Sequence, residues 1–305
     1  IQPMVTVVTA AILPILLNVA VGFLLAKRRY FDAHFLARFS GITFRFFIPC
    51  LLFASIYRAE ISLLALARYW SGYFVPLLIL FAVIALFARP LTALTTVYAN
   101  TVMVGIPLVV QTWGDTGLNI AVAVISLNSL TLFFTYALFA ALRGRGMTAG
   151  KLARDLGNTL KNPIIFSLVI GAALNLLHVP IYGPLVESLA LPGRAALPCS
   201  LLILGATLAG IPLRVQRRDQ LQIALICLCK LLLIPYAVYL FAGNVLHLAP
   251  QTTGVLVLLA ACPCGVNVLP FAQKSAADRQ LVSAAIFLST VIAVVTLPLW
   301  VYWVG

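Results

Sequence analysis

Apolar runs of helix length follow one another along nearly the whole chain. A helix needs about 20 residues to cross the hydrocarbon core of a bilayer, and on that basis we predict ten membrane spans. The predicted spans cover residues 5–26, 35–57, 69–88, 91–112, 117–142, 162–179, 183–211, 221–246, 252–273 and 279–304. Because only 9% of the residues are charged, against about 25% in soluble domains, we expect an all-α, multi-pass membrane protein. The connections are too short for a catalytic domain, so we do not expect an enzyme.

Positive charges gather in alternate connections between the predicted spans. The net charge of +13 would in a soluble protein suggest nucleic acid as a partner, but here its placement follows the membrane. The basic side holds Lys27, Arg28, Arg29, Arg89, Arg143, Arg145, Lys151, Arg154, Lys161, Arg214, Arg217, Arg218, Lys274 and Arg279. The other side holds only Arg58 and Arg68. The positive-inside rule therefore puts both termini on the outer side of the cell (inner) membrane, and no nucleic-acid partner is expected.

The second half of the chain repeats features of the first. A Pro-Ile pair followed by a glycine occurs at Pro14 and Gly22 and recurs 149 residues later at Pro163 and Gly171. At an offset of 163, further pairs match: Pro107 with Pro270, Asp115 with Asp278, and Ser126 with Ser289. Five spans per half is an odd number, so the second repeat is inverted relative to the first. We predict two five-helix repeats, residues 1–142 and 162–305, joined by a basic cytoplasmic linker at 143–161, an organisation typical of secondary transporters.

Glycine, proline and asparagine interrupt the fourth and ninth predicted spans. A proline inside a helix costs about 3 kcal/mol and a glycine about 1 kcal/mol relative to alanine, so both helices are predicted to break. Broken backbone at membrane depth lines a cavity or is buried in protein, and the freed helix N-termini attract anions. We therefore predict an anion-binding site at the breaks, against the alternative of ordinary proline kinks. Its candidate residues are Asn100, Thr101, Gly105, Pro107, Pro263, Gly265 and Asn267.

Four polar residues inside other spans need a reason to be there. Arg45 and Arg194 occupy equivalent repeat positions near mid-span, where an arginine costs about 2.5 to 3.5 kcal/mol. Each guanidinium could form a bidentate hydrogen bond with a substrate carboxylate. Alternatively, it could have a structural role and donate hydrogen bonds to helix carbonyls. Asn128 in the fifth span either lines the pocket or has a structural role. Lys230 is close enough to the cytoplasmic end of the eighth span for its ammonium to reach the interface.

The chain resembles the auxin efflux carrier family, which includes bacterial malonate- and malate-type permeases. The resemblance is carried by Asn100 to Pro107 with Gly114 and Gly117, by Lys161-Asn162-Pro163-Ile164 with Gly171, by Pro198 with Gly205, and by Pro263-x-Gly265 running into Ala272. It implies that the fourth and ninth helices cross at their breaks, that transport is elevator-like, and that the substrate is an organic carboxylate. It also implies that Asn100 and, more loosely, Asn128 contact the substrate. Ala99 stands where the plant members typically have proline, which together with the short linker favours a bacterial permease.

We therefore predict a secondary transporter for a mono- or dicarboxylate such as malonate or malate, with no cofactor and no metal. Asn100, Asn267 and the helix N-termini would hold one carboxylate, and Arg45 and Arg194 a second. A coupled proton or sodium ion and a homodimer are left open. The alternatives are a bile-acid-type sodium symporter or cation antiporter on a similar scaffold and, in another class, a membrane enzyme or sensor. The Cys262-Pro263-Cys264 triplet also occurs in heavy-metal pumps, but the chain has no residues for the cytoplasmic domains of such pumps.

Overall fold

The computed structural model describes residues 2–58, 62–143, 163–210, 217–272 and 275–305. Every named element in these ranges is a helix, and extended backbone pairs there only at an isolated antiparallel bridge between Ala99 and Cys264. The predicted all-α class is confirmed. Apart from Arg143, the predicted linker at 143–161 lies outside the described residues.

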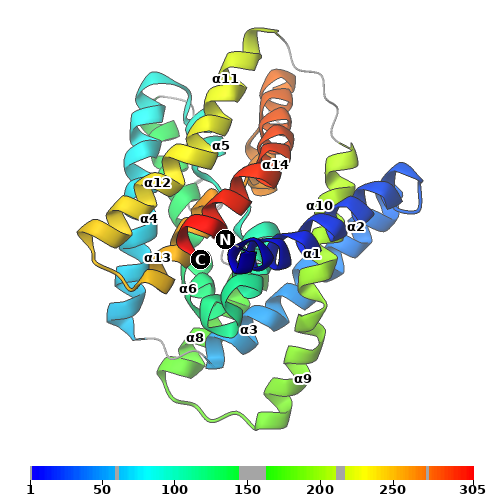
Figure 1. Cartoon of the computed structure of the whole chain (residues 1–305), viewed down its shortest axis with the longest axis vertical. Helices are drawn as coiled ribbons and strands as arrows, with labels where there is room; N and C mark the ends of the chain where they lie inside the picture. The colour runs from blue at the N-terminus through cyan, green and yellow to red at the C-terminus, as the bar shows by residue number, and fades with distance from the viewer. Residues whose placement is uncertain (1, 59–61, 144–162, 211–216, 273–274) are drawn as a thin grey trace.

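The described residues of the first half form six α-helices and two π-helical turns (Figure 1). The elements are α1 (Gln2–Lys27), α2 (Ala33–Ile42), η1 (Thr43–Phe47), α3 (Ile48–Arg58), α4 (Leu63–Phe87), α5 (Pro90–Val97), η2 (Thr101–Gly105) and α6 (Ile106–Leu142). Side-chain caps set two of the starts, because Asp32 and Ser62 accept hydrogen bonds from the first turns of α2 and α4. Arg143 holds the end of α4, since its guanidinium donates to the carbonyls of Leu86 and Ala88 at 2.9 and 2.7 Å.

The second half also consists of long helices interrupted by short π-helical or 3-10 turns. The elements are α8 (Pro163–Leu176), α9 (Gly183–Arg194), α10 (Ala196–Gly210), α11 (Arg217–Leu228), η3 (Cys229–Leu233), α12 (Ile234–Tyr239), η4 (Leu240–Val245), α13 (Pro250–Ala261), η5 (Val266–Ala272) and α14 (Ala276–Val304). Ser275 caps the start of α14. In the first turn of that helix Asp278 forms an ion pair with Arg89, which precedes α5. This pair joins the starts of α5 and α14.

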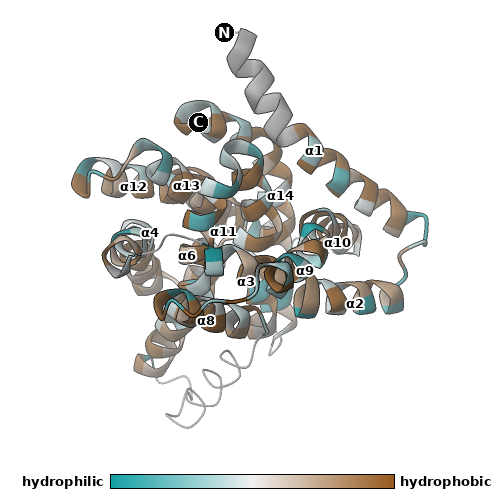
Figure 2. Ribbon diagram, turned by 90° about the horizontal axis from the view of Figure 1, so that it is seen from below, coloured by the Kyte–Doolittle hydropathy of each residue, from teal (hydrophilic) through white to brown (hydrophobic). Residues whose placement is uncertain are grey.

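Six helical stretches among the described residues are long and apolar enough to cross a membrane. They are Ala33–Arg58, Leu64–Phe87, Thr101–Leu142, Gly183–Gly210, Asp219–Val245 and Ala276–Val304. Shorter apolar helices cover Leu13–Lys27, Phe166–Leu176 and Pro250–Ala261, and hydrophobic residues predominate along the helices in Figure 2. The predicted multi-pass character is confirmed, whereas ten spans in two inverted repeats remains a prediction.

The connection predicted between residues 112 and 117 is a sharp kink. Within α6 two helical stretches meet there without an intervening loop. The one non-helical residue of α6 is Gly114, at φ 60° and ψ −146°. Glycine adopts this conformation without the steric penalty that a Cβ would bring. The chain therefore changes direction inside α6 at a single residue.

Two close helix pairs and one central helix organise the bundle. α1 packs along α10, and α3 packs along α8 (Figure 1). A Cβ on Gly205 of α10 would overlap the backbone of Val19 on α1, and a Cβ on Gly171 of α8 would lie 2.5 Å from the Ile56 side chain of α3. Glycine thus lets each pair approach closely, as small residues do between membrane helices. α13 is enclosed along most of its length, with every residue of 255–261 at 0% exposure.

Candidate functional site

Two helices break where the sequence predicts. α5 ends at Val97 and helical structure resumes at Thr101, while α13 ends at Ala261 and η5 begins at Val266. Proline cannot donate a backbone hydrogen bond, so Pro263 cannot continue the ladder of α13. Asn100 starts the new helical segment, because its Oδ1 accepts a 3.4 Å hydrogen bond from the backbone N of Met103. The breaks thus leave short extended segments inside the bundle.

The extended segments at the two breaks bind each other. The backbone N of Asn100 donates to the carbonyl of Pro263 at 2.8 Å, and the backbone N of Gly265 donates to the carbonyl of Tyr98 at 2.9 Å. A Cβ on Gly265 would lie only 2.6 Å from the Tyr98 ring, so this approach requires glycine. These bonds satisfy backbone groups that the broken helices would otherwise leave buried and unpaired.

A side chain from α14 supports the same crossing point. The backbone N of Cys264 donates to Oγ of Ser289 at 3.0 Å, and Ser289 itself has 0% exposure. Cys264 is also fully buried, so this hydroxyl is the partner of an N–H group that water does not reach. The break is therefore held by α14 as well as by its own paired backbone.

A small cavity of about 40 Å³ lies beside the paired breaks. Its polar lining comprises Tyr98, Asn100, Thr101, Asn128, Ser129 and Asn267. Two lining amides are unsatisfied: Nδ2 of Asn100 and Oδ1 of Asn128 are buried and have no hydrogen-bond partner among the described residues. A buried polar atom without a partner costs roughly 1 to 3 kcal/mol. Such atoms in one cavity are suited to a polar ligand that supplies the missing partners.

Tyr98 organises the remaining polar groups of the cavity. Its hydroxyl shares a 2.7 Å hydrogen bond with Oγ of Ser129 and accepts a 3.3 Å bond from Nδ2 of Asn267. Its ring stacks on Phe133 with centroids 5.1 Å apart. Sequence reasoning missed Tyr98 and Ser129, although Tyr98 lies two residues before Asn100 and Ser129 directly follows Asn128. This proximity in sequence was the available signal.

The structure brings together most of the predicted site residues. Asn100, Thr101, Asn128, Gly265 and Asn267 line the cavity, and the Pro263 carbonyl pairs with Asn100 beside it.

Four predicted residues lie elsewhere. Pro107 sits in the first turn of α6 and is not part of the lining, and a Cβ on Gly105 would meet Leu259 of α13 at 2.8 Å, so this glycine serves helix packing. Arg45 lines a surface hollow with other residues of α2 and η1. Arg194 pairs with Glu187 at 3.0 Å on the surface. Neither arginine reaches the cavity lining in this structure.

Lys230 is buried in η3 with 0% exposure. The expectation that its ammonium reaches the membrane interface is therefore wrong. The reason is that η3 turns this side chain inward: Lys230 and its neighbour Leu231 are buried, whereas Leu232 and Leu233 on the same turn are exposed.

The chain is similar in sequence to known transporters. Residues 7–301 match the family described as membrane transport protein. A Rhizobium meliloti protein named "Putative malonate transporter" is 29% identical over 202 residues, which are 65% of this chain and 62% of that protein. An "Uncharacterized transporter" of Methanothermobacter thermautotrophicus is 26% identical over 96% of this chain and 97% of its own length. The "Uncharacterized transporter YfdV" of Escherichia coli is 24% identical over 98% of each chain.

Proposed function

Because this chain belongs to the membrane transport protein family, also called the auxin efflux carrier family, we propose that it is a secondary transporter for a small organic anion. The proposed substrate is a mono- or dicarboxylate such as malonate or malate. The observation that carries this proposal is the buried, unpartnered Nδ2 of Asn100 beside two paired helix breaks. A carboxylate oxygen would accept from this amide and gain from the positive end of the helix that starts there.

The name of the Rhizobium relative supports malonate as a member of the substrate class. This chain matches less than two thirds of that protein's length, so we infer a carboxylate mainly from the polar cavity at the helix breaks. The positions of the two arginines add no support for their predicted contact with a second carboxylate. We place the carboxylate at Nδ2 of Asn100 instead, with Oδ1 of Asn128 accepting from a donor group of the substrate, such as a hydroxyl.

The packing supports the proposed architecture of two inverted five-helix repeats. Moving along the chain by 149 residues takes α1 onto α8 and α3 onto α10. The two close pairs, α1 with α10 and α8 with α3, are thereby exchanged. Such an exchange is what a twofold relation between repeats produces. In this arrangement both termini lie on the outer side of the cell membrane.

The size of the cavity supports a transport cycle with movement. A volume of about 40 Å³ has room for a few water molecules, since one water needs at least about 10 to 15 Å³, but not for a dicarboxylate. Helices must therefore separate to admit the substrate, and we propose an elevator-like alternation of access. Moving a dianion out of a cell with 100 mV, negative inside, releases about 4.6 kcal/mol. Efflux needs no coupled ion, whereas uptake would need a proton, sodium or an exchanged anion.

Transport into proteoliposomes tests the proposal. Labelled malonate, malate, lactate and indole acetate would be offered with and without a pH gradient, to the intact chain and to Asn100→Ala and Asn128→Ala. We expect saturable uptake of at least one carboxylate, a loss of tenfold or more in Asn100→Ala, and a smaller loss in Asn128→Ala.

Asn119→Ala is the matched control, because Asn119 lies on α6 outside the cavity lining. It should transport like the intact chain. Normal carboxylate uptake by Asn100→Ala would show that the cavity at the helix breaks does not bind the substrate. If none of the four anions is taken up, the alternatives of a cation antiporter or a bile-acid-type sodium symporter would be favoured.

A further inference from the structure

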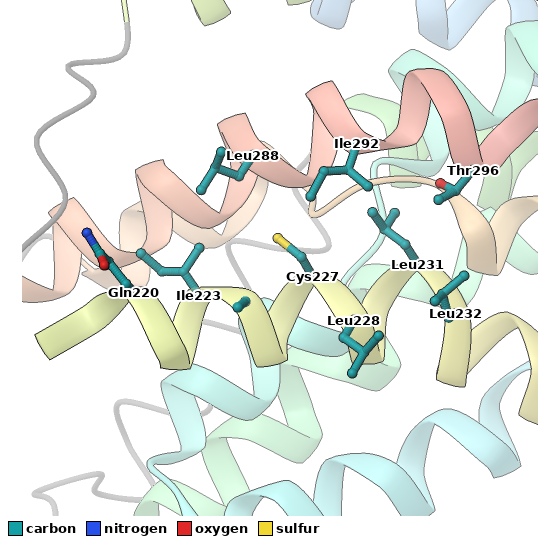
Figure 3. Close-up of a pocket in the computed structure, with 10 residues that line it drawn as sticks. Gln220, Ile223, Cys227, Leu228, Leu231, Leu232, Leu288, Ile292 and Thr296 are labelled. Atoms are coloured by element: carbon teal, nitrogen blue, oxygen red, sulfur yellow. The ribbon is translucent and has the colours of Figure 1, made fainter. Parts of the chain in front are cut away.

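A groove of about 520 Å³ runs between α11 and α14 (Figure 3). Its floor is buried and apolar, formed by Ile223, Cys227 and Leu231 at 2%, 5% and 1% exposure. Its rims are open, since Leu228 and Ile292 are 55% and 41% exposed. Figure 3 shows the Cys227 thiol in the space between the two helices. The groove is separate from the cavity at the helix breaks, with which it shares no lining residue.

The two helices that form the groove run in the same direction. Ile223 and Cys227 near the start of α11 pack with Leu281 and Ala284 near the start of α14. Further along, Nε1 of Trp300 donates to the carbonyl of Leu231 at 2.8 Å. Both helix N-termini therefore lie at one end of the groove, where their partial positive charges add.

Basic residues are concentrated at this same end. The first turn of α11 contains Arg217, Arg218 and Asp219, directly before Gln220 at the mouth of the groove, so basic residues outnumber acidic ones there. In the first turn of α14, Asp278 is paired with Arg89 and Arg279 is exposed. The other end is apolar apart from Thr296. The groove thus has a cationic mouth and an apolar length.

The length of the groove matches one leaflet of a bilayer. From Gln220 to Leu232 the helix rises by about 18 Å at 1.5 Å per residue, and half of the hydrocarbon core is about 15 Å. We propose that the groove binds an anionic phospholipid, with one acyl chain along Ile223, Cys227 and Leu231 and the phosphate at the basic mouth. Basic pockets at the ends of membrane helices bind such headgroups.

A lipid in this groove would contact the helix that supports the breaks. α14 presents Leu288 and Ile292 to the groove, while the intervening Ser289 accepts the hydrogen bond from Cys264. An acyl chain that fixes this stretch of α14 therefore also steadies the crossing point. The inference does not depend on which substrate the protein carries.

Thermal unfolding of the purified chain tests the proposal. Phosphatidylglycerol or phosphatidylcholine with the same acyl chains would be added in detergent, and the unfolding midpoint measured. We expect phosphatidylglycerol to raise the midpoint by several degrees and phosphatidylcholine to raise it less. Ala224→Trp, which fills the open groove, should abolish the rise. Leu225→Trp is the control, because Leu225 is exposed on α11 outside the groove, and it should keep the rise.

Two further variants separate the headgroup from the chain. Replacing Arg217 and Arg218 by glutamine should make the shifts with the two lipids equal. This variant tests the headgroup if Ala224→Trp fails to fold. Thr296→Val should leave the rise intact, because the hydroxyl of Thr296 is buried without a partner among the described residues and an acyl chain has nothing to offer it.

Four results would overturn the proposal. The first three are equal shifts with both lipids in the intact chain, a full shift in Ala224→Trp, and loss of the shift in Thr296→Val, which would indicate a ligand with a polar inner end. A change from dimer to monomer in Ala224→Trp would also overturn it, by assigning the groove to a subunit contact.

Discussion

The ammonium of Lys230 donates a 2.8 Å hydrogen bond to the carbonyl oxygen of Ala260, one residue before α13 ends at its break. Carbonyls in the last turn of a helix lack intrahelical partners and carry partial negative charge. The lysine therefore caps the broken end of α13 from a neighbouring helix. No ion pair among the described residues includes Lys230, so a charged ammonium here remains available to favour an anion at the crossing point.

Lys230→Met should weaken carboxylate transport, because it removes the buried positive charge while keeping a side chain of similar length. We expect the KM for uptake to rise about tenfold, which corresponds to about 1.4 kcal/mol. Lys230→Arg retains the charge and should retain more of the affinity. Uptake kinetics in proteoliposomes measure both. An unchanged KM in Lys230→Met would show that the lysine caps α13 but does not contribute to substrate binding.

Ser289→Ala should destabilise the protein by about 1 to 3 kcal/mol, because it leaves the buried backbone N of Cys264 without a partner. Ser126→Ala is a matched control at the equivalent position of the first predicted repeat. Its hydroxyl donates only to the carbonyl of Ala123 on its own helix, so we expect little change. Thermal unfolding in detergent measures the difference. Equal midpoints for the two variants would contradict a supporting role for Ser289.

Local signals in the sequence predicted the helices and their breaks well. Apolar runs mark the long helices, and the proline and glycine at Pro263 and Gly265 disrupt a helix whatever surrounds them. The sequence predicted a break between residues 112 and 117, but not that Gly114 alone would form it as a kink between two helical stretches of α6.

Contacts between distant segments were harder to predict. The sequence gives the depth of Arg45 and Arg194 in their helices but not the direction in which each side chain points. Arg194 lies two turns after Glu187, on the same helix face, and Arg58 of α3 joins them with a 2.8 Å bond to that carboxylate. The partnership of Tyr98 with Ser129 and Asn267 likewise exists only once α6 and the two breaks have packed together.

Arg45→Gln and Arg194→Gln should each transport a dicarboxylate with the KM of the intact chain, because both side chains are exposed and outside the cavity lining. Malonate uptake compared with uptake of a monocarboxylate measures this. A rise in KM for the dicarboxylate alone would show that the arginines do meet a second carboxylate during the cycle, as the repeat positions predicted.

Tyr98→Phe should lower stability by about 0.5 to 1.5 kcal/mol, because it removes the hydroxyl shared with Ser129 and Asn267 but keeps the ring stacked on Phe133. It should also raise the KM for the carboxylate, since Asn267 loses the partner that orients it in the cavity. Unfolding and uptake would be measured on the same preparation. A stability loss with unchanged KM would make Tyr98 a structural residue of the crossing point only.

Gly205→Ala should be among the most damaging single-methyl changes in the chain. The added Cβ would overlap the carbonyl of Val19, so α1 and α10 must separate along their contact. Overpacking of this kind typically costs about 1 to 3 kcal/mol, which exceeds the gain of about 1 kcal/mol in helix propensity from glycine to alanine. Gly41→Ala on α2 is the control, because nothing lies within 4 Å of its added Cβ, and its midpoint should stay level or rise. If Gly205→Ala unfolds at or above the midpoint of Gly41→Ala, the close approach of α1 to α10 does not exist in the membrane-extracted protein, and the exchange of helix pairs that supports the repeats loses its basis.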